Sequence, residues 1–116
     1  MPFALVWTAQ ARETFEQLQA AAQASIEKRT TVGKTKVAKP PGLFKQFVKC
    51  VELLAANPRH PGLQTQEYTS IENPYDKNAK VFEAYVQQRT PGAYRVFWCY
   101  GPQKGEITII AITPHP

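Results

Sequence analysis

The sequence predicts an α+β domain in which two helices pack on one face of an antiparallel sheet. Three observations predict this class: two amphipathic segments in the first half, three β-rich segments in the second half, and a short apolar run at the start. The 116 residues fit a single domain spanning positions 1–116, long enough to bury roughly two-thirds of the unfolded surface. Because each helix is apolar on one side only, both helices need the sheet as a packing partner.

The chain is expected to open with a strand followed by a helix. Residues 2–7 form the apolar run, and Thr8 follows as a candidate N-cap because its hydroxyl can accept a hydrogen bond from a free helical N–H. The first helix is predicted from Ala9 to about Lys28. Its apolar positions recur at helical spacing, at Phe15, Leu18, Ala22 and Ile26.

A loop and a second helix are predicted next. Residues 29–42 combine glycine, β-branched residues and a Pro-Pro pair, which predicts an exposed loop. Between Phe44 and Ala55, apolar residues recur at i, i+3, i+4 and i+7, which is typical of an amphipathic helix. Asn57 and Pro58 end this pattern, since proline cannot continue a helix.

The second half predicts an antiparallel meander of three to four strands. Its β-rich segments are Lys80 to Val86, Tyr94 to Tyr100 and Glu106 to Thr113, and short Pro/Gly turns separate them. Short connections make neighbouring strands antiparallel. Glu67 to Ser70 is expected to add a short fourth strand.

Positive charge is concentrated in one part of the chain. Fourteen Lys and Arg residues against nine Asp and Glu residues give a net charge of +5, which favours a polyanionic partner. Half of the basic residues fall in a stretch without an acid: Lys28, Arg29, Lys34, Lys36, Lys39, Lys45 and Lys49. Such a stretch is often only a solvated face, but its field also suits phosphate binding.

Several classes of protein are disfavoured by composition. Cys50 and Cys99 are too few for a disulfide scaffold and are expected to be small buried side chains in a reduced cytoplasm. No leader or membrane span is expected, because no apolar run has the necessary length. His60 and His115 are far apart and no carboxylate pair has ligand spacing, so neither a metal nor a cofactor is expected.

A set of short motifs occurs together along the chain. The expected elements follow the order of one strand, two helices and then further strands. The motifs are Trp7-Thr8 before the first helix, NPRHPGL at 57–63, the strand VFEAYV, the pair Tyr94-Arg95, and a terminal strand followed by His115. In combination, over nearly the whole length, the chain resembles the RelE/ParE family of type II toxin–antitoxin toxins. The resemblance implies a RelE-like fold, a bacterial cytoplasmic location and a cognate antitoxin. For the RelE branch it implies ribosome-dependent mRNA cleavage that blocks translation.

The same resemblance implies three catalytic residues. Arg95 matches the strand arginine that contacts the scissile phosphate in RelE-like nucleases. His115 corresponds to the catalytic His or Arg at the end of the last strand, and Glu83 lies on the strand where some members carry a charged catalytic group. The chain departs from the family in two ways: no C-terminal helix or catalytic tyrosine follows Pro116, and the basic segment is longer than a minimal member needs.

The chemistry of RNA is compatible with this set. RNA carries its own nucleophile, the 2′-hydroxyl, so cleavage needs no metal. An imidazole with a pKa near ~6.5 can transfer a proton, and a guanidinium can neutralise charge that develops on the phosphate. RNA binding is then expected to involve Lys34, Lys36, Lys39, Lys45, Lys49, Arg59 and Lys80.

Each of these residues also has a purely structural interpretation. Arg95 can cover apolar surface while its head reaches solvent or a carboxylate, Glu83 can face solvent, and His115 can be a frayed terminal residue. His60 is expected to be a turn residue after the second helix. Alternation along 94–100 places Arg95 on the sheet face opposite Val96 and its i+2 neighbours.

Two further functions stay open. A ParE-like toxin would inhibit DNA gyrase and need no catalytic residues. A degenerate toxin would be retained only to bind its antitoxin. In each case an antitoxin helix or strand carrying acidic residues could cover the basic surface. The sequence does not choose between the ribosome and gyrase as the target.

Overall fold

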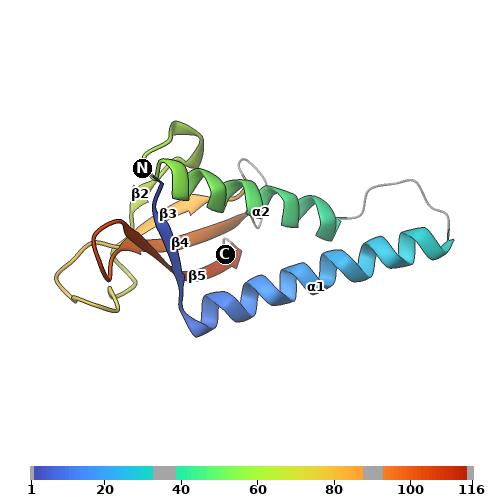
Figure 1. Cartoon of the computed structure of the whole chain (residues 1–116), viewed down its shortest axis with the longest axis horizontal. Helices are drawn as coiled ribbons and strands as arrows, with labels where there is room; N and C mark the ends of the chain where they lie inside the picture. Colours follow the sequence, from blue (N-terminus) through green and yellow to red (C-terminus); the bar gives the residue numbers. More distant parts are fainter. Residues whose placement is uncertain (1, 33–38, 88–92, 115–116) are drawn as a thin grey trace.

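A computed structural model describes residues 2–32, 39–87 and 93–114, without the side chains of residues 25–41. The elements, in order, are β1 (Ala4–Trp7), α1 (Ala9–Val32), α2 (Lys39–Ala56), the 3-10 turn η1 (Pro61–Leu63), β2 (Gln66–Glu67), β3 (Phe82–Tyr85), β4 (Tyr94–Tyr100) and β5 (Glu106–Pro114). Figure 1 shows α1 and α2 running alongside each other and extending past the end of the sheet. The predicted α+β class is confirmed.

The sheet has the strand order β1-β5-β4-β3-β2. β3, β4 and β5 form the predicted antiparallel meander, and the short strand β2 lies antiparallel to β3 at one edge. This edge strand begins at Gln66 instead of the expected Glu67. At the other edge β1 pairs in parallel with β5, from Ala4 opposite Glu106 to Trp7 opposite Ile109. The sheet therefore joins the two ends of the chain.

The loop predicted over residues 29–42 is wrong at both ends. α1 continues to Val32 and α2 begins at Lys39, while residues 33–38 lie outside the described part of the chain. Pro40 and Pro41 fall in the first turn of α2. The N–H groups of a first helical turn have no acceptor within the helix, so a proline there, which lacks this N–H, removes no hydrogen bond. Its fixed φ also favours the helical conformation. The proline pair therefore begins a helix.

The start of α1 is tied to the sheet through Thr8. Its Oγ1 accepts a hydrogen bond from the N–H of Ala11 at 3.1 Å, which confirms the predicted N-cap. The same hydroxyl donates to the carbonyl of Ile110 on β5 at 2.7 Å. One side chain therefore positions the first helix relative to a central strand.

Both helices bury their apolar sides on the same face of the sheet. Phe47 and Leu54 of α2 lie in one buried cluster with Val96, Trp98 and Ile109 from the central strands. Each of these five side chains is fully buried. The partly buried α1 residues that pack against the cluster are Phe15 and Leu18. The predicted helix-on-sheet layering is thus correct.

The opposite face of the sheet is also covered. Arg95, Phe97 and Cys99 alternate with the core residues of β4, as predicted, and all three are buried. The segment after β2 accounts for part of this cover. The Tyr68 ring lies 4.6 Å from that of Phe97, and the hydroxyl of Tyr75 lies 2.9 Å from Thr108 Oγ1 on β5.

The core makes a direct prediction about stability. Replacing Leu54 with alanine removes a fully buried side chain between α2 and the sheet. The free energy of unfolding is expected to fall by about 2–5 kcal/mol, the usual cost of such a cavity. Urea denaturation followed by circular dichroism measures this change. The exposed Lys45→Ala variant is the control and should stay within about 0.5 kcal/mol of the parent.

Candidate functional site

Glu83 and Arg95 form a buried ion pair on the face of the sheet away from the helices. The register of β3 and β4 pairs Glu83 with Phe97 and Tyr85 with Arg95, so the two charged residues are diagonal neighbours on one face. Arg95 Nη1 donates to Glu83 Oε2 at 2.7 Å, and the side chains are only 9% and 8% exposed. Charges removed from water this far need each other, because either one alone would carry a large desolvation cost.

Tyr85 extends this pair toward the surface. Its hydroxyl donates to Glu83 Oε1 at 3.3 Å, so the carboxylate is shared between a guanidinium and a phenol. Burial is the main cause that raises the pKa of Tyr85, and the charge of Glu83 and its hydrogen bond act in the same direction, against the charge of Arg95. The phenol therefore keeps its proton at neutral pH and can act as a donor.

The guanidinium of Arg95 is enclosed by aromatic rings. Its central carbon lies 5.6 Å from the centre of the Tyr68 ring and 5.0 Å from that of Phe97. Arg95 Nε is buried and has no hydrogen-bond partner among the described residues. Unmet buried donors are unusual, and Trp98 Nε1 in the core is a second one among the described residues.

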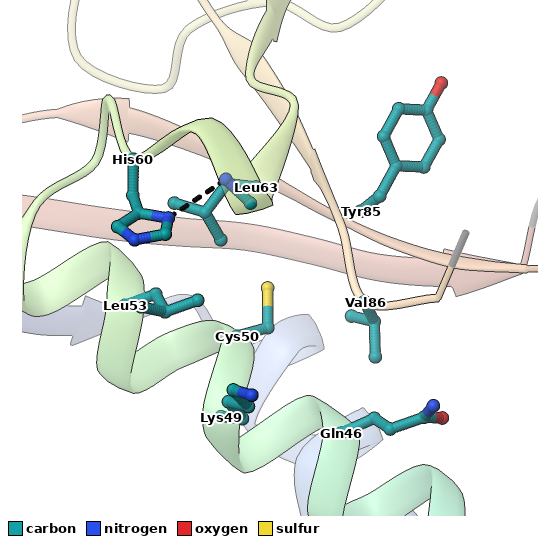
Figure 2. Close-up of a pocket in the computed structure, with 9 residues that line it drawn as sticks. Gln46, Lys49, Cys50, Leu53, His60, Leu63, Tyr85 and Val86 are labelled. Atoms are coloured by element: carbon teal, nitrogen blue, oxygen red, sulfur yellow. Dashed lines mark hydrogen bonds between the residues drawn. The ribbon is translucent and has the colours of Figure 1, made fainter.

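A pocket of about 500 Å³ lies between α2, η1 and the end of β3, on the side of the sheet that the helices cover. Figure 2 shows the His60 ring at one end, Cys50 and Leu53 on the α2 wall, and the Tyr85 ring pointing away from these side chains. Its lining is completed by Gln46, Lys49, Gly62, Leu63 and Val86. Val86 faces the pocket, whereas the Tyr85 hydroxyl bonds to Glu83 on the opposite face of the sheet, so the pocket and the charged network are separate features.

His60 is held in a defined orientation at the pocket. Its Nδ1 accepts a hydrogen bond from the N–H of Gly62 at 2.9 Å and caps η1, which confirms the predicted turn role. With Nδ1 acting as acceptor, the ring proton of the neutral imidazole lies on Nε2. His60 therefore offers a fixed donor at the edge of the pocket.

The cysteines take no part in this chemistry. Cys50 and Cys99 are buried, as predicted, and neither forms a disulfide. Burial raises the pKa of Cys50 to about 12 and also raises that of Cys99. Both thiols thus stay protonated and are poor nucleophiles at neutral pH.

The basic residues expected to bind RNA do not all gather at the pocket. Lys45, Lys49, Arg59 and Lys80 are exposed, but of these only Lys49 lines the pocket. Lys80 Nζ lies 3.7 Å from Glu67 Oε2, and the Arg59 guanidinium lies 6.0 Å from the centre of the Phe82 ring. Lys34 and Lys36 lie outside the described residues, as does the side chain of Lys39.

The position of His115 also lies outside the described residues. β5 nevertheless ends close to the network, because Thr113 pairs with Arg95 and Pro114 pairs with Tyr94. A shared site for His115 and Arg95 stays a prediction.

The alternative interpretation of Glu83 as a solvent-facing strand residue is wrong, since it is buried against Arg95. Sequence reasoning also missed the network through Tyr85 and the pocket containing His60. One signal was available: Glu83, Tyr85 and Arg95 share a face of one hairpin, with opposite charges on adjacent strands. The pocket had no such signal, because α2, η1 and β3 meet only in the folded chain.

Within 2–32, 39–87 and 93–114, no three His, Cys, Asp or Glu side chains gather as metal ligands would. Over the same residues, neither helix combines the length and apolar character that crossing a membrane requires.

Comparisons with known proteins define the fold. No family model matches the chain, and no curated protein matches it. The RelE–RelB complex of the archaeon Pyrococcus horikoshii OT3 matches with a TM-score of 0.56 and 13% identity, over 98% of this chain and 96% of that chain. The YoeB/ParE toxin of Agrobacterium tumefaciens matches with a TM-score of 0.59 and 10% identity, over 97% and 99%. The chain thus has the fold of RelE/ParE-like toxins, as the motif resemblance implied.

The ion pair predicts an asymmetric response to mutation. Glu83→Ala leaves Arg95 charged and buried without its partner, so the free energy of unfolding should fall by about 3–5 kcal/mol. Replacing both residues, as in Glu83→Leu with Arg95→Met, should restore most of that loss because no buried charge remains. Urea denaturation of Glu83→Ala, of the single variants Glu83→Leu and Arg95→Met, and of the double variant measures the coupling. Additive losses would contradict it.

Tyr85 predicts a specific titration. Its phenol should ionise at a higher pH than free tyrosine, whose pKa is about 10, and Glu83→Gln should lower this pKa by removing the adjacent negative charge. Because the folded pKa is raised, its stabilising contribution is complete below pH ~10 and is lost as the pH rises through the folded value. Tyrosinate absorbance, with Tyr85→Phe to assign the signal, measures both effects. An unchanged pKa in Glu83→Gln would remove Glu83 as a cause.

Proposed function

We propose that this chain is the toxin of a type II toxin–antitoxin system and that it cleaves mRNA on the ribosome without a metal ion. The observation that carries the proposal is the fold, which matches two structures named as RelE and YoeB/ParE toxins over nearly their whole length. The Glu83–Arg95–Tyr85 network supplies charge and a proton donor on one sheet face of that fold.

The proposed roles follow from the geometry of this network. The 2′-hydroxyl of RNA attacks the adjacent phosphorus and the 5′-oxygen leaves with a proton, giving a cyclic phosphate. Arg95 stabilises the phosphate oxygens through its unpartnered Nε, and His115 transfers protons. The role of Glu83 is to position the guanidinium, because its carboxylate accepts the hydrogen bond from Arg95 Nη1. Positioning of mRNA by the ribosome supplies the in-line geometry.

Access to Arg95 requires a local rearrangement. The guanidinium lies beneath the half-buried Tyr68 ring, so this ring has to move before a phosphate reaches Nε. An activated state that forms only on the ribosome would confine cleavage to translated mRNA. This requirement supports a target-dependent nuclease over a free ribonuclease.

A cognate antitoxin is the second proposed partner. One of the comparison structures is a complex of RelE with RelB, and the present chain has its fold. With a net charge of +5, the chain is suited to an acidic partner. A toxin of this kind acts in the cytoplasm of the cell that produces it, where both the ribosome and the antitoxin are found.

Cell-free translation tests the nuclease function. The parent protein should truncate mRNA, and Arg95→Lys should reduce the cleavage rate by about 10²–10³-fold, because the bidentate, preorganised guanidinium is lost. His115→Gln should reduce it by about 10²–10⁴-fold. Circular dichroism confirms that each variant is folded. Full cleavage by a folded Arg95→Lys protein would remove Arg95 from the mechanism.

Inhibition of DNA gyrase is the second candidate function, and the burial of Arg95 favours it. A guanidinium side chain that is 9% exposed and paired with Glu83 has the character of a structural ion pair, and a gyrase inhibitor needs no catalytic residues. A supercoiling assay separates the two functions. Inhibition of gyrase at protein concentrations that leave mRNA intact would establish the ParE-like function, and inactivity in both assays would indicate a module that only binds antitoxin.

A further inference from the structure

We propose that the free edge of β1 pairs with β1 of a second copy of this chain, so that the two sheets join into one. β1 lies at the end of the strand order and has a neighbour, β5, on one side only. Figure 1 shows β1, in dark blue, leading directly into α1. The inference goes beyond the nuclease and gyrase functions and depends on neither, because Glu83 and Arg95 lie on β3 and β4, toward the other edge of the sheet.

The backbone of β1 alternates between its two sides. The N–H of Ala4 donates to the carbonyl of Gly105 at 2.9 Å, and the N–H of Thr8 donates to that of Ile109 at 3.1 Å. In a parallel ladder every second residue directs both its N–H and its C=O to the same neighbour. The even-numbered residues of β1 therefore bond to β5, and the odd-numbered residues direct their backbone groups outward.

Two residues form the open part of this edge. The outward N–H of Phe3 is taken by the carbonyl of Ala55, at the end of α2, at 2.7 Å. The outward N–H and C=O groups of Leu5 and Trp7 have no hydrogen-bond partner among the described residues. Leu5 and Trp7 thus present one free donor and one free acceptor each.

The sequence of β1 does nothing to prevent pairing. Soluble proteins protect their edge strands with proline, with charged side chains or with a β-bulge. β1 has the apolar sequence ALVW, and its register with β5 is continuous from Ala4 to Trp7. An unprotected edge of this kind is a template for another strand.

The bond at Phe3 selects the register of the pair. Two-fold symmetry makes the identical strands antiparallel. If Leu5 lay opposite Leu5 of the second copy, Trp7 would face Phe3, whose N–H is already used. With Val6 opposite Val6, Leu5 of each copy faces Trp7 of the other, and the two residues exchange both bonds. Every outward group of Leu5 and Trp7 is then paired.

An apolar pocket beside Trp7 adds to the contact. Trp7 and Phe15 are half-buried, their ring centres lie 5.3 Å apart, and they line a space of about 430 Å³ with a polar rim that includes Arg12 and Glu16. Residues opposite each other in an antiparallel pair lie on the same face of the sheet. Leu5 of the second copy would therefore lie beside Trp7 on the side of this pocket, and the pairing removes apolar surface of both copies from water.

The charge around this edge favours a second copy over an acidic partner. Residues 2–24 carry one basic and two acidic side chains, Arg12, Glu13 and Glu16, which sum to a net charge of −1, whereas the whole chain has a net charge of +5. An acidic peptide is attracted to the rest of the chain, which holds the positive charge. Two copies that approach through the nearly neutral edge of β1 meet little repulsion.

Sedimentation velocity of the purified chain tests for the dimer. The parent protein should change from monomer to dimer between about 1 and 100 μM, because a contact of this size is weak and reversible. Leu5→Pro should raise the concentration needed at least about tenfold, since proline lacks the outward N–H and costs no bond to β5. Leu5→Val keeps the N–H and is the matched control, which should dimerise like the parent. A parent that stays monomeric at 100 μM, or equal dimerisation of these two folded variants, would overturn the proposal.

Cross-linking tests the register without proline. Val6→Cys places two thiols at a non-hydrogen-bonded pair, whose Cα atoms lie about 4.5 Å apart, within reach of a disulfide. Mild oxidation with diamide should then give a covalent dimer. Ala4→Cys is the matched control: it shares a face of β1 with Val6 but faces Thr8 of the other copy, so it should stay monomeric. The native Cys50 and Cys99 are buried. Equal cross-linking of the two variants would reject the pairing.

Hydrogen exchange identifies the surface that the dimer uses. The amides of Leu5 and Trp7 should exchange rapidly at low protein concentration and slowly at 100 μM. Those of Ala4 and Thr8 should change little, because they are already bonded to β5. A dimer that leaves Leu5 and Trp7 unprotected uses another surface and contradicts the proposal. These measurements involve neither RNA nor gyrase, so their outcome is independent of the proposed function.

Discussion

The buried pair of Glu83 and Arg95 is the interaction on which the candidate site depends. Placing both charges on one face of a hairpin excludes water from each of them, and this is tolerable only while the 2.7 Å hydrogen bond holds. The pair then determines what surrounds it. Tyr68 and Phe97 pack on the guanidinium, and Tyr85 uses the remaining oxygen of the carboxylate. The contacts of Tyr68, Phe97 and Tyr85 on this face of the sheet therefore all depend on this one ion pair.

The ion pair that stabilises the fold also limits how Arg95 can bind a phosphate. A guanidinium held by a carboxylate has little net charge to offer a phosphate, so a nuclease would have to use Nε or open the pair. The first route uses the unpartnered Nε and requires the Tyr68 ring to move aside. Trp98 Nε1 is a second buried donor without a partner among the described residues, so such donors also occur in the core of this fold.

Local patterns were sufficient to predict much of the fold, and non-local contacts were not. Helical periodicity, the Thr8 cap and the hairpin turns identified α1, α2 and the meander because each depends on neighbouring residues. The parallel pairing of β1 with β5 joins residues about a hundred positions apart, and no local pattern encodes it. Pro40 and Pro41 misled the prediction because proline ends one helix and begins another by the same property. Within the site, Arg95 and Glu83 were identified separately, but their mutual contact depends on strand register.

The location of the pocket follows from the shortness of β2. This strand covers only Phe82 and Glu83 of β3, so Tyr85 lies beyond its end, where η1 and α2 form the walls instead of another strand. A longer β2 would bury this edge and leave no space there. The chain reverses at Gln64, which has a left-handed φ of 48° directly after η1, and this turn sets the point where β2 can start. The length of one edge strand thus determines whether the pocket at the end of β3 exists.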